Sequence, residues 1–507
     1  MWKDKIVYDG NITNKENTKQ IDIDRNILLL TDSYKLTHWK QYPPGTEKVY
    51  SYFESRGGEF PEVVFFGLQY FIKKYLEGNV VNKEAIDEAE YIVSKHLSDK
   101  NLFNRKGWEY ILKEYDGKLP VSIRSVPEGT VVPVSNVLIT IENTDPNCYW
   151  LTNYLETLLV QTWYPITVAT LSMHMKKMLL EKLEQTGDPT QIEFKLHDFG
   201  FRGVSSVESA ALGGAAHLVN FKGTDTIAGL MMLRRYYDAD MAGFSIPAAE
   251  HSTITSWGRE NEAKAMENML TQFPNGLVAV VSDSYDIYNA CSNIWGDELK
   301  QKVLSRQGTV IVRPDSGTPE KVVVEVLNLL ADKFGFTKNV KGYKLLPPQI
   351  RVIQGDGIEY SSTRRILNAM EGAGWSVDNV AFGMGGGLLQ KLNRDSQRFA
   401  FKCSNITIRG EERGVFKDPI TDSGKVSKIG KLKLILRNDG TYATLQQKDN
   451  GDDKLVEVFR DGMALSHFKL EDIRARAAYG LSNLLELEGN AIQSVNMLLR
   501  QALTNQG

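Results

Sequence analysis

LVAVVSDSYD (277–286), TVIVRPDSG (309–317), IRVIQGDG (350–357) and NVAFGMGGG (379–387) are short apolar runs that stop abruptly at polar or glycine residues, and a helical pattern follows each run. Runs of this length that are rich in Val and Ile are typical of strands buried on both faces of a parallel sheet. Strands and helices that alternate in this way predict an α/β barrel. In such a barrel the carboxyl ends of all the strands open onto one face.

Charged side chains and glycines occupy the ends of these predicted strands. The residues concerned are Asp283, Arg313, Asp315, Asp356 and the glycines at 385–387. Because the strand ends share one face of the barrel, these residues are expected to converge on one pocket. Carboxylates suit ribose hydroxyls or a hydrated Mg²⁺, and exposed backbone N–H groups suit phosphate. The combination predicts a ligand that carries both phosphate and hydroxyl groups.

The glycine run does not belong to either of two common nucleotide-binding motifs. GMGGG at 383–387 does not match GxGxxG, because position 388 is Leu, and no GxxxxGK[ST] occurs anywhere in the chain. A dinucleotide fingerprint and a P-loop are therefore excluded. The run instead resembles the phosphate-binding loops of late barrel strands, although a glycine run by itself is often only a tight turn.

The bulk composition is that of a globular protein. The 507 residues are too many for one ordinary core, so two domains are expected. The net charge of −3 predicts neither a nucleic-acid partner nor an anionic membrane partner, and no apolar run approaches the ~20 residues of a membrane span. Three widely spaced cysteines are typical of a reducing cytoplasm.

β-rich segments are expected on both sides of the barrel in the sequence. Residues 121–142 predict an antiparallel unit, and residues 432–447 predict a hairpin that turns at 438–440. We also expect a short strand at 26–30 and helices at 66–76, 83–97, 149–161, 166–185 and 470–501, with a break at 163–165. The division is a mobile tail (1–25), the N-terminal part of an α+β domain (26–165), an α/β barrel (166–400) and the C-terminal part of the α+β domain (401–507).

Five further residues are candidates for binding or catalysis. His251 stands among small and polar residues, which favours a reactive imidazole over the structural role that most histidines have. Phe199 and Tyr34 each fit a core position, and each could equally offer a flat face to a heteroaromatic ring. Arg202 adds a cation close to Phe199, and Asp225 could accept a hydrogen bond from an amide group.

Several cations follow the glycine loop in the sequence. They are Arg394, Lys402, Lys417, Lys425 and Lys428. Lysines at this density are usually solvated. A loop with several cations just after a glycine turn would also bind pyrophosphate, so both interpretations stay open.

Strings along most of the chain resemble one enzyme family. TDSYKLTHWKQYPPGT, YSYFESR, KLHDFGFRGVSS, NFKGTDT, PAAEHSTIT, VSDSYDIYNA, RPDSG, VIQGDG, FGMGGGLLQK and FKDP closely resemble, in this order, the nicotinamide phosphoribosyltransferase family. The resemblance implies a type II phosphoribosyltransferase, with an irregular α/β barrel and a β-rich domain, that works as a cytoplasmic homodimer with both active sites at the interface. The implied reaction joins nicotinamide to 5-phosphoribosyl-1-pyrophosphate, giving nicotinamide mononucleotide and pyrophosphate for NAD salvage, with Mg²⁺.

Nicotinamide-binding roles follow from the resemblance, position by position. It implies that Phe199 and Tyr34 of the partner subunit sandwich the nicotinamide ring, and that Arg313 lies against the ring. Asp225 would accept a hydrogen bond from the carboxamide, and Ser245 belongs to the same site. A carboxylate at this position favours the amide over nicotinate, whose own carboxylate it would repel.

Roles toward the second substrate and toward ATP are implied in the same way. The residues implied for ribose, phosphate and pyrophosphate are Arg56, Arg202, Asp315, Gly355, Asp356, Gly385, Gly386, Arg394, Lys402 and Lys417. His251 is similar to the family's phosphorylatable histidine, which couples ATP hydrolysis to a better equilibrium. The implied catalytic residues are His251, Asp315, Asp283 and Arg313. Mg²⁺ is expected to be held through the pyrophosphate, Asp283 or Asp315.

Two positions depart from the family's pattern. Met384 and Ala400 stand where serines are expected, so one or two side-chain hydrogen bonds to phosphate would be lost.

Three other functions compete with this one. Nicotinate phosphoribosyltransferase is disfavoured by Asp225. A sugar-phosphate isomerase or aldolase would need an enolising base or a Schiff-base lysine at a strand end, and none is found there. A catalytically silent relative is disfavoured because His251, Asp315 and Arg313 are all present.

Overall fold

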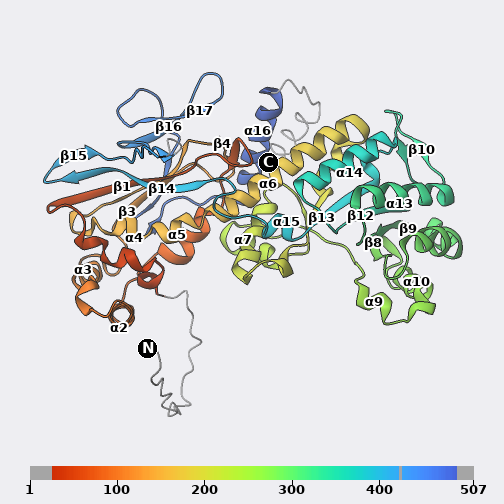
Figure 1. The fold of residues 1–507 in the computed structure, drawn as a ribbon, viewed down its shortest axis with the longest axis horizontal. Coiled ribbons are helices and arrows are strands. Elements are labelled where there is room, and N and C mark those ends of the chain that lie inside the picture. Colours follow the sequence, from red (N-terminus) through yellow and green to blue (C-terminus); the bar gives the residue numbers. More distant parts are fainter. Residues whose placement is uncertain (1–25, 422–424, 488–507) are drawn as a thin grey trace, which may run out of the picture.

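A computed structural model describes residues 26–421 and 425–487 of the chain. The molecule is elongated, with an antiparallel sheet at one end and a parallel sheet covered by helices at the other (Figure 1). The long helix α6 (Trp163–Thr186) runs between the two ends. The predicted tail at 1–25 and the part of the predicted C-terminal helix beyond residue 487 lie outside the described residues.

The antiparallel sheet takes its strands from both ends of the sequence. Its order is β15-β14-β1-β5-β3-β18-β19. The N-terminal strands are β1 (Thr46–Ser55), β3 (Val121–Ser125) and β5 (Val137–Asn143), and the C-terminal strands are β14 (Phe399–Ile408), β15 (Glu411–Gly414), β18 (Val456–Arg460) and β19 (Met463–Ala464). β1 lies between β5 and β14 and is buried along most of its length. The prediction of a β-rich domain built from both flanking segments is confirmed.

Smaller elements complete this end of the molecule. The expected hairpin pairs β16 (Leu432–Leu436) with β17 (Tyr442–Gln446), and β2 (Glu62–Val64) pairs with β4 (Val131–Pro133). Helices α2 (Lys83–His96), α3 (Arg105–Tyr115), α4 (Leu151–Tyr154), α5 (Glu156–Val160) and α16 (Leu470–Leu487) are also formed. The predicted helix at 66–76 appears as α1 (Leu68–Phe71) followed by a π-helical turn at Ile72–Leu76.

The parallel sheet contains the four strands that decide the fold. Its order is β7-β6-β13-β12-β9-β8, and every neighbouring pair is parallel. The strands are β6 (Leu196–Asp198), β7 (Gly223–Thr224), β8 (Asn275–Val281), β9 (Gln307–Arg313), β12 (Ile350–Gln354) and β13 (Val380–Met384). The prediction of four parallel strands is confirmed by β8, β9, β12 and β13, and burial is nearly complete in β12 and β13 but not at the start of β8 and β9.

An extended segment, residues 244–249, connects the two edges of this sheet. Phe244 bridges to Gly223 of β7, and Ala248 bridges to Ala279 of β8. Pro247 carries no backbone N–H to donate, so this segment makes isolated bridges where a regular strand would make a ladder. The strands and the segment follow one another round the ring in chain order, so the predicted irregular α/β barrel is confirmed.

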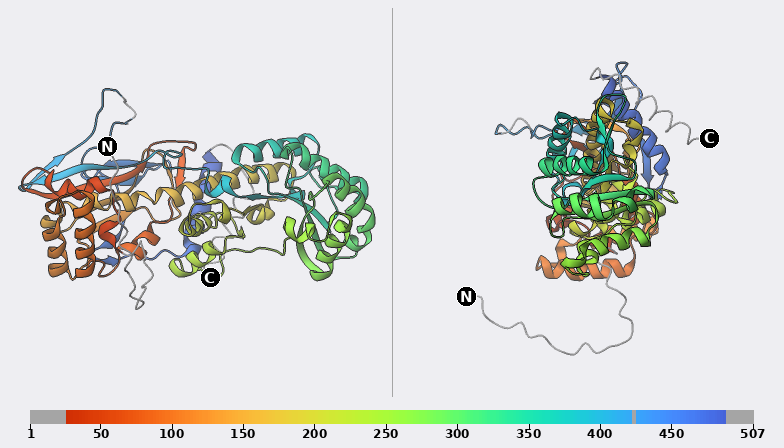
Figure 2. Two further views of the ribbon diagram at one scale, coloured as in Figure 1. Left: turned by 60° about the horizontal axis from the view of Figure 1, so that its bottom comes forward. Right: turned by 90° about the vertical axis from the view of Figure 1, so that its right-hand side faces the viewer.

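Helices cover the outside of the barrel and connect its strands. They are α7 (Val207–His217), α8 (Ile227–Tyr236), α9 (His251–Thr255), α10 (Glu262–Gln272), α12 (Lys300–Leu304), α13 (Pro319–Phe334) and α14 (Tyr360–Gly372). α13 illustrates why they pack there, because Val322, Val326 and Leu330 recur at helical spacing and are all buried. Figure 2 shows the green and teal helices α9, α10, α13 and α14 at the end of the molecule that lies away from the antiparallel sheet, whereas α7 lies nearer the middle (Figure 1).

Two local predictions are wrong. The predicted strand at 26–30 is a 3₁₀-helix at Ile27–Leu29, because the Asn26 side chain accepts a hydrogen bond from the Leu28 N–H at 3.1 Å and caps the turn. The predicted break at 163–165 is displaced, because α5 ends at Val160 and α6 begins at Trp163, so the break falls at 161–162. Pro165 lies in the first turn of α6, where the missing N–H has no helical partner to lose. The domain limits stay a prediction, and residues 165 and 400 lie inside α6 and β14.

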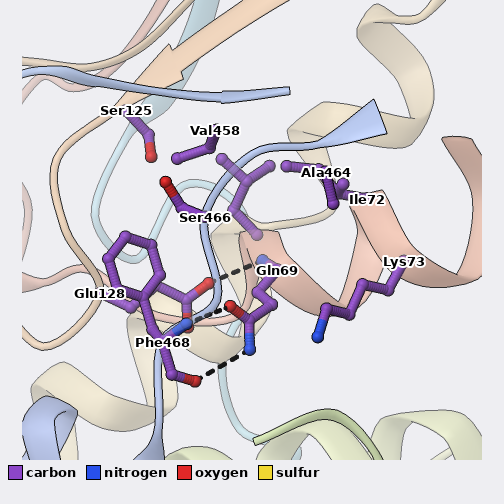
Figure 3. A pocket seen from close by; sticks show the side chains of 10 residues that line it. Gln69, Ile72, Lys73, Ser125, Glu128, Val458, Ala464, Ser466 and Phe468 are labelled. Atoms are coloured by element: carbon purple, nitrogen blue, oxygen red, sulfur yellow. Dashed lines mark hydrogen bonds between the residues drawn. The ribbon is translucent and has the colours of Figure 1, made fainter. Parts of the chain in front are cut away.

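The two ends of the molecule meet at a buried polar cluster (Figure 3). The Gln69 side chain donates to the carbonyl oxygens of Tyr236 at 2.6 Å and Phe468 at 3.0 Å, and it accepts from the Phe468 N–H at 2.6 Å. The Gln69 N–H donates to the Glu128 carboxylate at 2.7 Å. Glu128 is buried, and burial raises its pKa to about 7. The end of α8 is thereby connected to segments from both ends of the chain.

Candidate active site

The ring of Phe199 lies across the ends of two barrel strands. Phe199 follows β6, and its N–H donates to the Met384 carbonyl at 3.0 Å. A Cβ atom added at Gly383 would lie 1.9 Å from Phe199 Cε2, and one added at Gly355 would lie 3.5 Å from the same atom. Glycine at 383 is therefore what allows the ring to lie over β13. An aromatic ring is thus placed at the carboxyl end of the barrel strands, and it is partly exposed there.

Arg313, at the end of β9, lies beside this ring and carries an ion pair. Its guanidinium carbon is 5.7 Å from the centroid of the Phe199 ring. Its Nη2 atom donates to both carboxylate oxygens of Asp315 at 2.9 Å, and its Nε atom donates to Oδ1 at 3.2 Å. About a fifth of each side chain is exposed, 22% and 20%. The pair is thus held by three hydrogen bonds and is still partly exposed at the carboxyl end of the strands.

Asp225 stands at the end of β7, next to the segment that connects the sheet edges. The Ser245 hydroxyl donates to Asp225 Oδ1, and the Asp225 N–H donates to the Asp198 carbonyl at 2.9 Å. Asp225 is exposed, so its second carboxylate oxygen is accessible to a ligand. The structure therefore brings Asp225 and Ser245 together, as their common assignment to one site requires.

Asp198 is a residue of this region that the sequence analysis missed. It is fully buried, and its Oδ1 atom accepts from the Gly200 N–H at 2.7 Å, which holds the turn that carries Phe199. Burial raises the pKa of Asp198 to about 6. The signal in the sequence is the pattern Asp-Phe-Gly after a strand, because an Asp that caps its own turn is common in such loops.

His251 begins helix α9 and faces the end of β8. Its Nε2 atom lies 3.1 Å from Asp283 Oδ1, and the Ser316 hydroxyl donates to Asp283 Oδ2 at 2.5 Å. The Asp283 side chain is 4% exposed, whereas that of His251 is 48% exposed. An exposed imidazole is thus held by a buried carboxylate. Ser316 was not singled out from the sequence.

The glycine-rich strand ends complete the pocket on the side of β12 and β13. Gly385 lies close to the Phe199 carbonyl, since an added Cβ would be 3.5 Å from that oxygen. Nothing lies within 4 Å of a Cβ built on Gly386, so its backbone is open to a ligand. The turn at Phe201–Gly203, which carries Arg202, lies beside Gly386. Asp356 follows β12, and its carbonyl accepts from the Gln354 side chain at 2.9 Å.

A second group of predicted residues lines a cavity of about 720 Å³ in the antiparallel domain. The predicted site residues that line it are Tyr34, Arg56, Arg394, Lys402 and Lys417. Arg398, Lys425 and Ala400 also line it. Burial lowers the pKa of Lys402, and the neighbouring cations Arg56, Arg394 and Lys417 act in the same direction. Such a concentration of cations suits a ligand with several negative charges.

The two groups of site residues are separate within one chain. The barrel group, defined as Phe199, Asp225, His251, Asp283, Arg313 and Asp315, does not contribute to the lining of the cavity. The cavity is lined by Arg56, which follows β1, by the start of β14 and by α5, and Figure 1 shows β14 and α5 on the side of the molecule away from β8 and β9. The resemblance assigned both groups to one active site at a subunit interface, and within one chain the two groups lie apart.

Neither a cluster of metal-binding side chains nor a membrane-spanning helix is found in the described part of the chain. Among residues 26–421 and 425–487, no three His, Cys, Asp or Glu side chains are grouped so that they could hold a metal ion. None of the helices in these two ranges has the length and apolar character needed to span a membrane.

Comparisons with known proteins agree over most of the chain. Residues 26–123 match the family model "Nicotinamide phosphoribosyltransferase, N-terminal domain", and residues 194–463 match the "Nicotinate phosphoribosyltransferase (NAPRTase) family". A nicotinamide phosphoribosyltransferase of Xanthomonas campestris pv. campestris is 51% identical over 463 residues, which cover 89% of this chain and 98% of that protein. One of Acinetobacter baylyi is 33% identical over 501 residues, 90% of this chain and 98% of that protein.

A solved structure shows the same fold at low sequence identity. Nicotinate-nucleotide pyrophosphorylase from Pyrococcus furiosus superposes with a TM-score of 0.58 at 16% identity, covering 93% of this chain and 99% of that one. The combination of a barrel with a separate antiparallel domain therefore recurs in that structure.

Proposed function

The chain belongs to the nicotinamide phosphoribosyltransferase family, and from this premise we propose how its two groups of residues make one active site. The enzyme is a phosphoribosyltransferase that joins nicotinamide to 5-phosphoribosyl-1-pyrophosphate, giving nicotinamide mononucleotide and pyrophosphate. The observation that carries the proposed site is the aromatic face of Phe199 with Arg313 beside it and the Asp315 carboxylate held by that arginine.

Nicotinamide binds against Phe199 in this proposal. The flat pyridine ring stacks on the phenyl ring beside the Arg313 guanidinium, and the carboxamide N–H₂ donates to Asp225. The Ser245 hydroxyl donates to the Asp225 carboxylate and so holds that carboxylate in place for the carboxamide. Nicotinate would place a second carboxylate near that of Asp225, which is unfavourable by like-charge repulsion.

The ribose and its phosphates extend from this ring along the open face of the barrel. Asp315, Gly355 and Asp356 stand at neighbouring strand ends and would bind the ribose hydroxyls. Gly385 and Gly386 offer backbone that a phosphate can approach closely. The pyridine nitrogen has a lone pair and needs no base, so the residues act by positioning and by stabilising charge as the bond from the anomeric carbon to pyrophosphate breaks.

The cavity residues of a second copy of the chain would complete this site. Tyr34, Arg56, Arg394, Lys402 and Lys417 form a basic half-site that one chain holds away from its own barrel group. In a homodimer, Tyr34 of the partner subunit would cover the free face of the nicotinamide, and the cations would neutralise phosphate and pyrophosphate. The supporting observation is that the cavity gathers six cations, beside the carboxylates of Asp32, Glu156 and Asp395, whereas the barrel group carries the Phe199 ring on which nicotinamide would stack.

Mg²⁺ fits this site when it is bound together with the pyrophosphate. Asp315 is held bidentately by Arg313, and Asp283 is held by His251 and Ser316, so neither carboxylate stands free for a metal cage made by protein alone. Mg²⁺ commonly binds one or two carboxylates together with substrate phosphates and water. Asp283 or Asp315 would hold it in that way, and the ion would supply neutralisation of charge on the leaving pyrophosphate.

His251 is proposed to couple ATP hydrolysis to the transfer. Its hydrogen bond to Asp283 requires a proton on Nε2, which leaves the lone pair on Nδ1 to accept a phosphoryl group. The imidazole is half exposed, so a nucleotide can reach it. We place the reaction in the cytoplasm, in line with the three cysteines Cys148, Cys291 and Cys403, all of which are free.

Subunit complementation tests the composite site. Asp315→Ala removes the barrel half and Lys417→Ala removes the cavity half, and each variant alone is expected to be inactive. When the two variants are mixed and dimers are allowed to re-form, half of the dimers contain one subunit of each variant. Each mixed dimer carries one intact site, so activity should return to up to about one quarter of the wild-type value. No recovery, with mixed dimers demonstrated by differential tags, would contradict a site shared between subunits.

Product analysis tests the chemistry separately. The purified enzyme is given 5-phosphoribosyl-1-pyrophosphate and Mg²⁺ with either nicotinamide or nicotinate, with and without ATP. Nicotinamide mononucleotide is the expected product, and stimulation by ATP is expected to disappear in His251→Ala. Formation of nicotinate mononucleotide as the preferred product would overturn the role given to Asp225.

A further inference from the structure

The Asp283 carboxylate is held at both of its oxygens, by the first residue of helix α9 and by a residue of the loop that follows β9. Oδ1 lies 3.1 Å from His251 Nε2, and Oδ2 accepts from the Ser316 hydroxyl at 2.5 Å. The Asp283 side chain is almost completely buried, at 4% exposed. A buried carboxylate with a donor at each oxygen has little freedom to rotate. Its orientation, and with it the orientation of the imidazole, therefore depends on both donors.

Ser316 reaches Asp283 because the backbone around it is closely determined. Strands β8 and β9 pair with Val281 opposite Arg313, and the Ser282 N–H donates to the Arg313 carbonyl at 3.0 Å. This pairing places the residues just after β8 beside those just after β9. Gly317 then turns the chain with a φ of +88°, a conformation that glycine adopts without strain. The hydroxyl is thus presented to Asp283 by the same loop that carries Asp315.

We propose that Ser316 is a positioning residue for the phosphorylation of His251, acting through Asp283. The inference deepens the proposed function and rests on the role given there to His251. Ser316 holds Oδ2 so that Oδ1 faces Nε2, and this keeps the proton on Nε2 and the lone pair on Nδ1. Because Ser316 adjoins Asp315, the hydrogen bond also connects the ribose-binding loop with the histidine.

The phosphoryl step shows why the orientation of Asp283 matters. Nδ1 attacks the terminal phosphorus of ATP, the N–P bond forms as the P–O bond to ADP breaks, and ADP leaves with the electron pair. The ring then carries a positive charge, since Nε2 keeps its proton. A carboxylate fixed against that N–H stabilises the imidazolium as it forms. Water later breaks the N–P bond, which releases inorganic phosphate and restores the neutral imidazole.

The test compares Ser316→Ala with Ser316→Thr, which keeps the hydroxyl, and with Ser305→Ala as a matched control. Ser305 lies in an exposed turn, where its hydroxyl donates only to the Lys302 carbonyl, at 3.3 Å. Incorporation of radiolabel from the terminal phosphate of ATP is measured for each, together with transfer rates with and without ATP. Ser316→Ala should reduce labelling by about tenfold, the scale for loss of a group that orients a ligand through a neighbour. ATP-dependent transfer should fall more than ATP-independent transfer.

A spectroscopic readout separates this inference from the proposed function. Uniform ¹⁵N labelling of the seven histidines reports which ring nitrogen of His251 carries the proton, with His251→Ala used for assignment. The wild type and Ser316→Thr should show the proton on Nε2, and Ser316→Ala should show a mixture of tautomers. Labelling and tautomer at wild-type values in Ser316→Ala would overturn the inference. If the wild type takes up no label, the ATP-coupled function fails, and the tautomers alone decide whether Ser316 positions the ring.

Discussion

The guanidinium of Arg313 lies 5.7 Å from the centroid of the Phe199 ring, although the strands that carry the two residues are not neighbours. β12 and β13 lie between β9 and β6 in the sheet. Both intervening strand ends carry glycine at this level. A Cβ at Gly355 would be 3.4 Å from Arg313 Nε, and a Cβ at Gly383 would overlap the phenyl ring. Glycine at 383 is thus what lets the phenyl ring lie over β13 beside Arg313, whereas a Cβ at Gly355 would make only ordinary contact.

Gly383→Ala should displace the Phe199 ring. The new methyl group would lie 1.9 Å from Phe199 Cε2, a distance that requires the ring to move. The KM for nicotinamide is expected to rise by about tenfold or more, equivalent to about 1.4 kcal/mol of binding. Gly372→Ala is the matched control, because nothing lies within 4 Å of its added Cβ. Unchanged steady-state kinetics in Gly383→Ala would show that nicotinamide does not bind against this ring.

Arg313→Lys should impair the enzyme even though the charge is kept. Lysine cannot donate to both Asp315 oxygens through a planar fork, and it offers no flat group beside Phe199. Loss of charge-assisted hydrogen bonds worth about 1.5–3 kcal/mol corresponds to a fall in kcat/KM of about 10- to 100-fold. Arg365→Lys removes a comparable surface contact to Glu320, at 3.2 Å, and should leave the kinetics unchanged. Equal kcat/KM values for the two variants would argue against a role for the planar guanidinium of Arg313.

Asp225→Asn should relax the choice between nicotinamide and nicotinate. Asparagine keeps the size and removes the negative charge that repels nicotinate. The ratio of kcat/KM for the amide over the acid is expected to fall by about 10- to 100-fold, as removal of a close like-charge contact predicts. Parallel assays with both bases provide the measurement, and Asp240→Asn serves as a control, since the Asp240 side chain is 94% exposed. A ratio that does not change would place base selection elsewhere.

Glu128→Gln should change how stability depends on pH. Burial raises the pKa of Glu128 from 4.5 to about 7, so between these values the unfolded chain releases the proton first and stability falls as pH rises. Below the lower value the carboxyl is protonated in both states and has no such effect. Above the upper value the full cost is about 3 kcal/mol, from 1.36 kcal/mol per pKa unit. Glutamine carries no charge, and therefore removes this dependence.

Thermal unfolding of the two proteins across this pH range provides the check. The difference in Tm, variant minus wild type, should grow from about pH 5 to about pH 8, because only the wild type bears a buried charge at the higher pH. Glu298→Gln, at an exposed position, should give a constant difference. A difference that is the same at both ends of the range for Glu128→Gln would mean that this carboxyl does not titrate in the folded protein as described.

The barrel fold and several of its site residues could be predicted from the amino-acid sequence alone. Buried runs of Val and Ile are local patterns, so β8, β9, β12 and β13 could be predicted from their own residues. Because parallel strands in a barrel all end on one face, Asp283, Arg313 and Asp315 could be assigned to one pocket without knowledge of the strand order. The hairpin of β16 and β17 followed in the same way from its turn residues.

Contacts between distant parts of the chain were decided by tertiary structure alone. The segment at 244–249 joins the sheet edges by isolated bridges that have no sequence period. Ser316 meets Asp283 across 33 positions, and Asp198 is fully buried although no local pattern specifies it. The separation of the basic cavity from the barrel group is the largest such effect. Motif order along a chain carries no information about distance in space, because that distance is set by how whole domains pack.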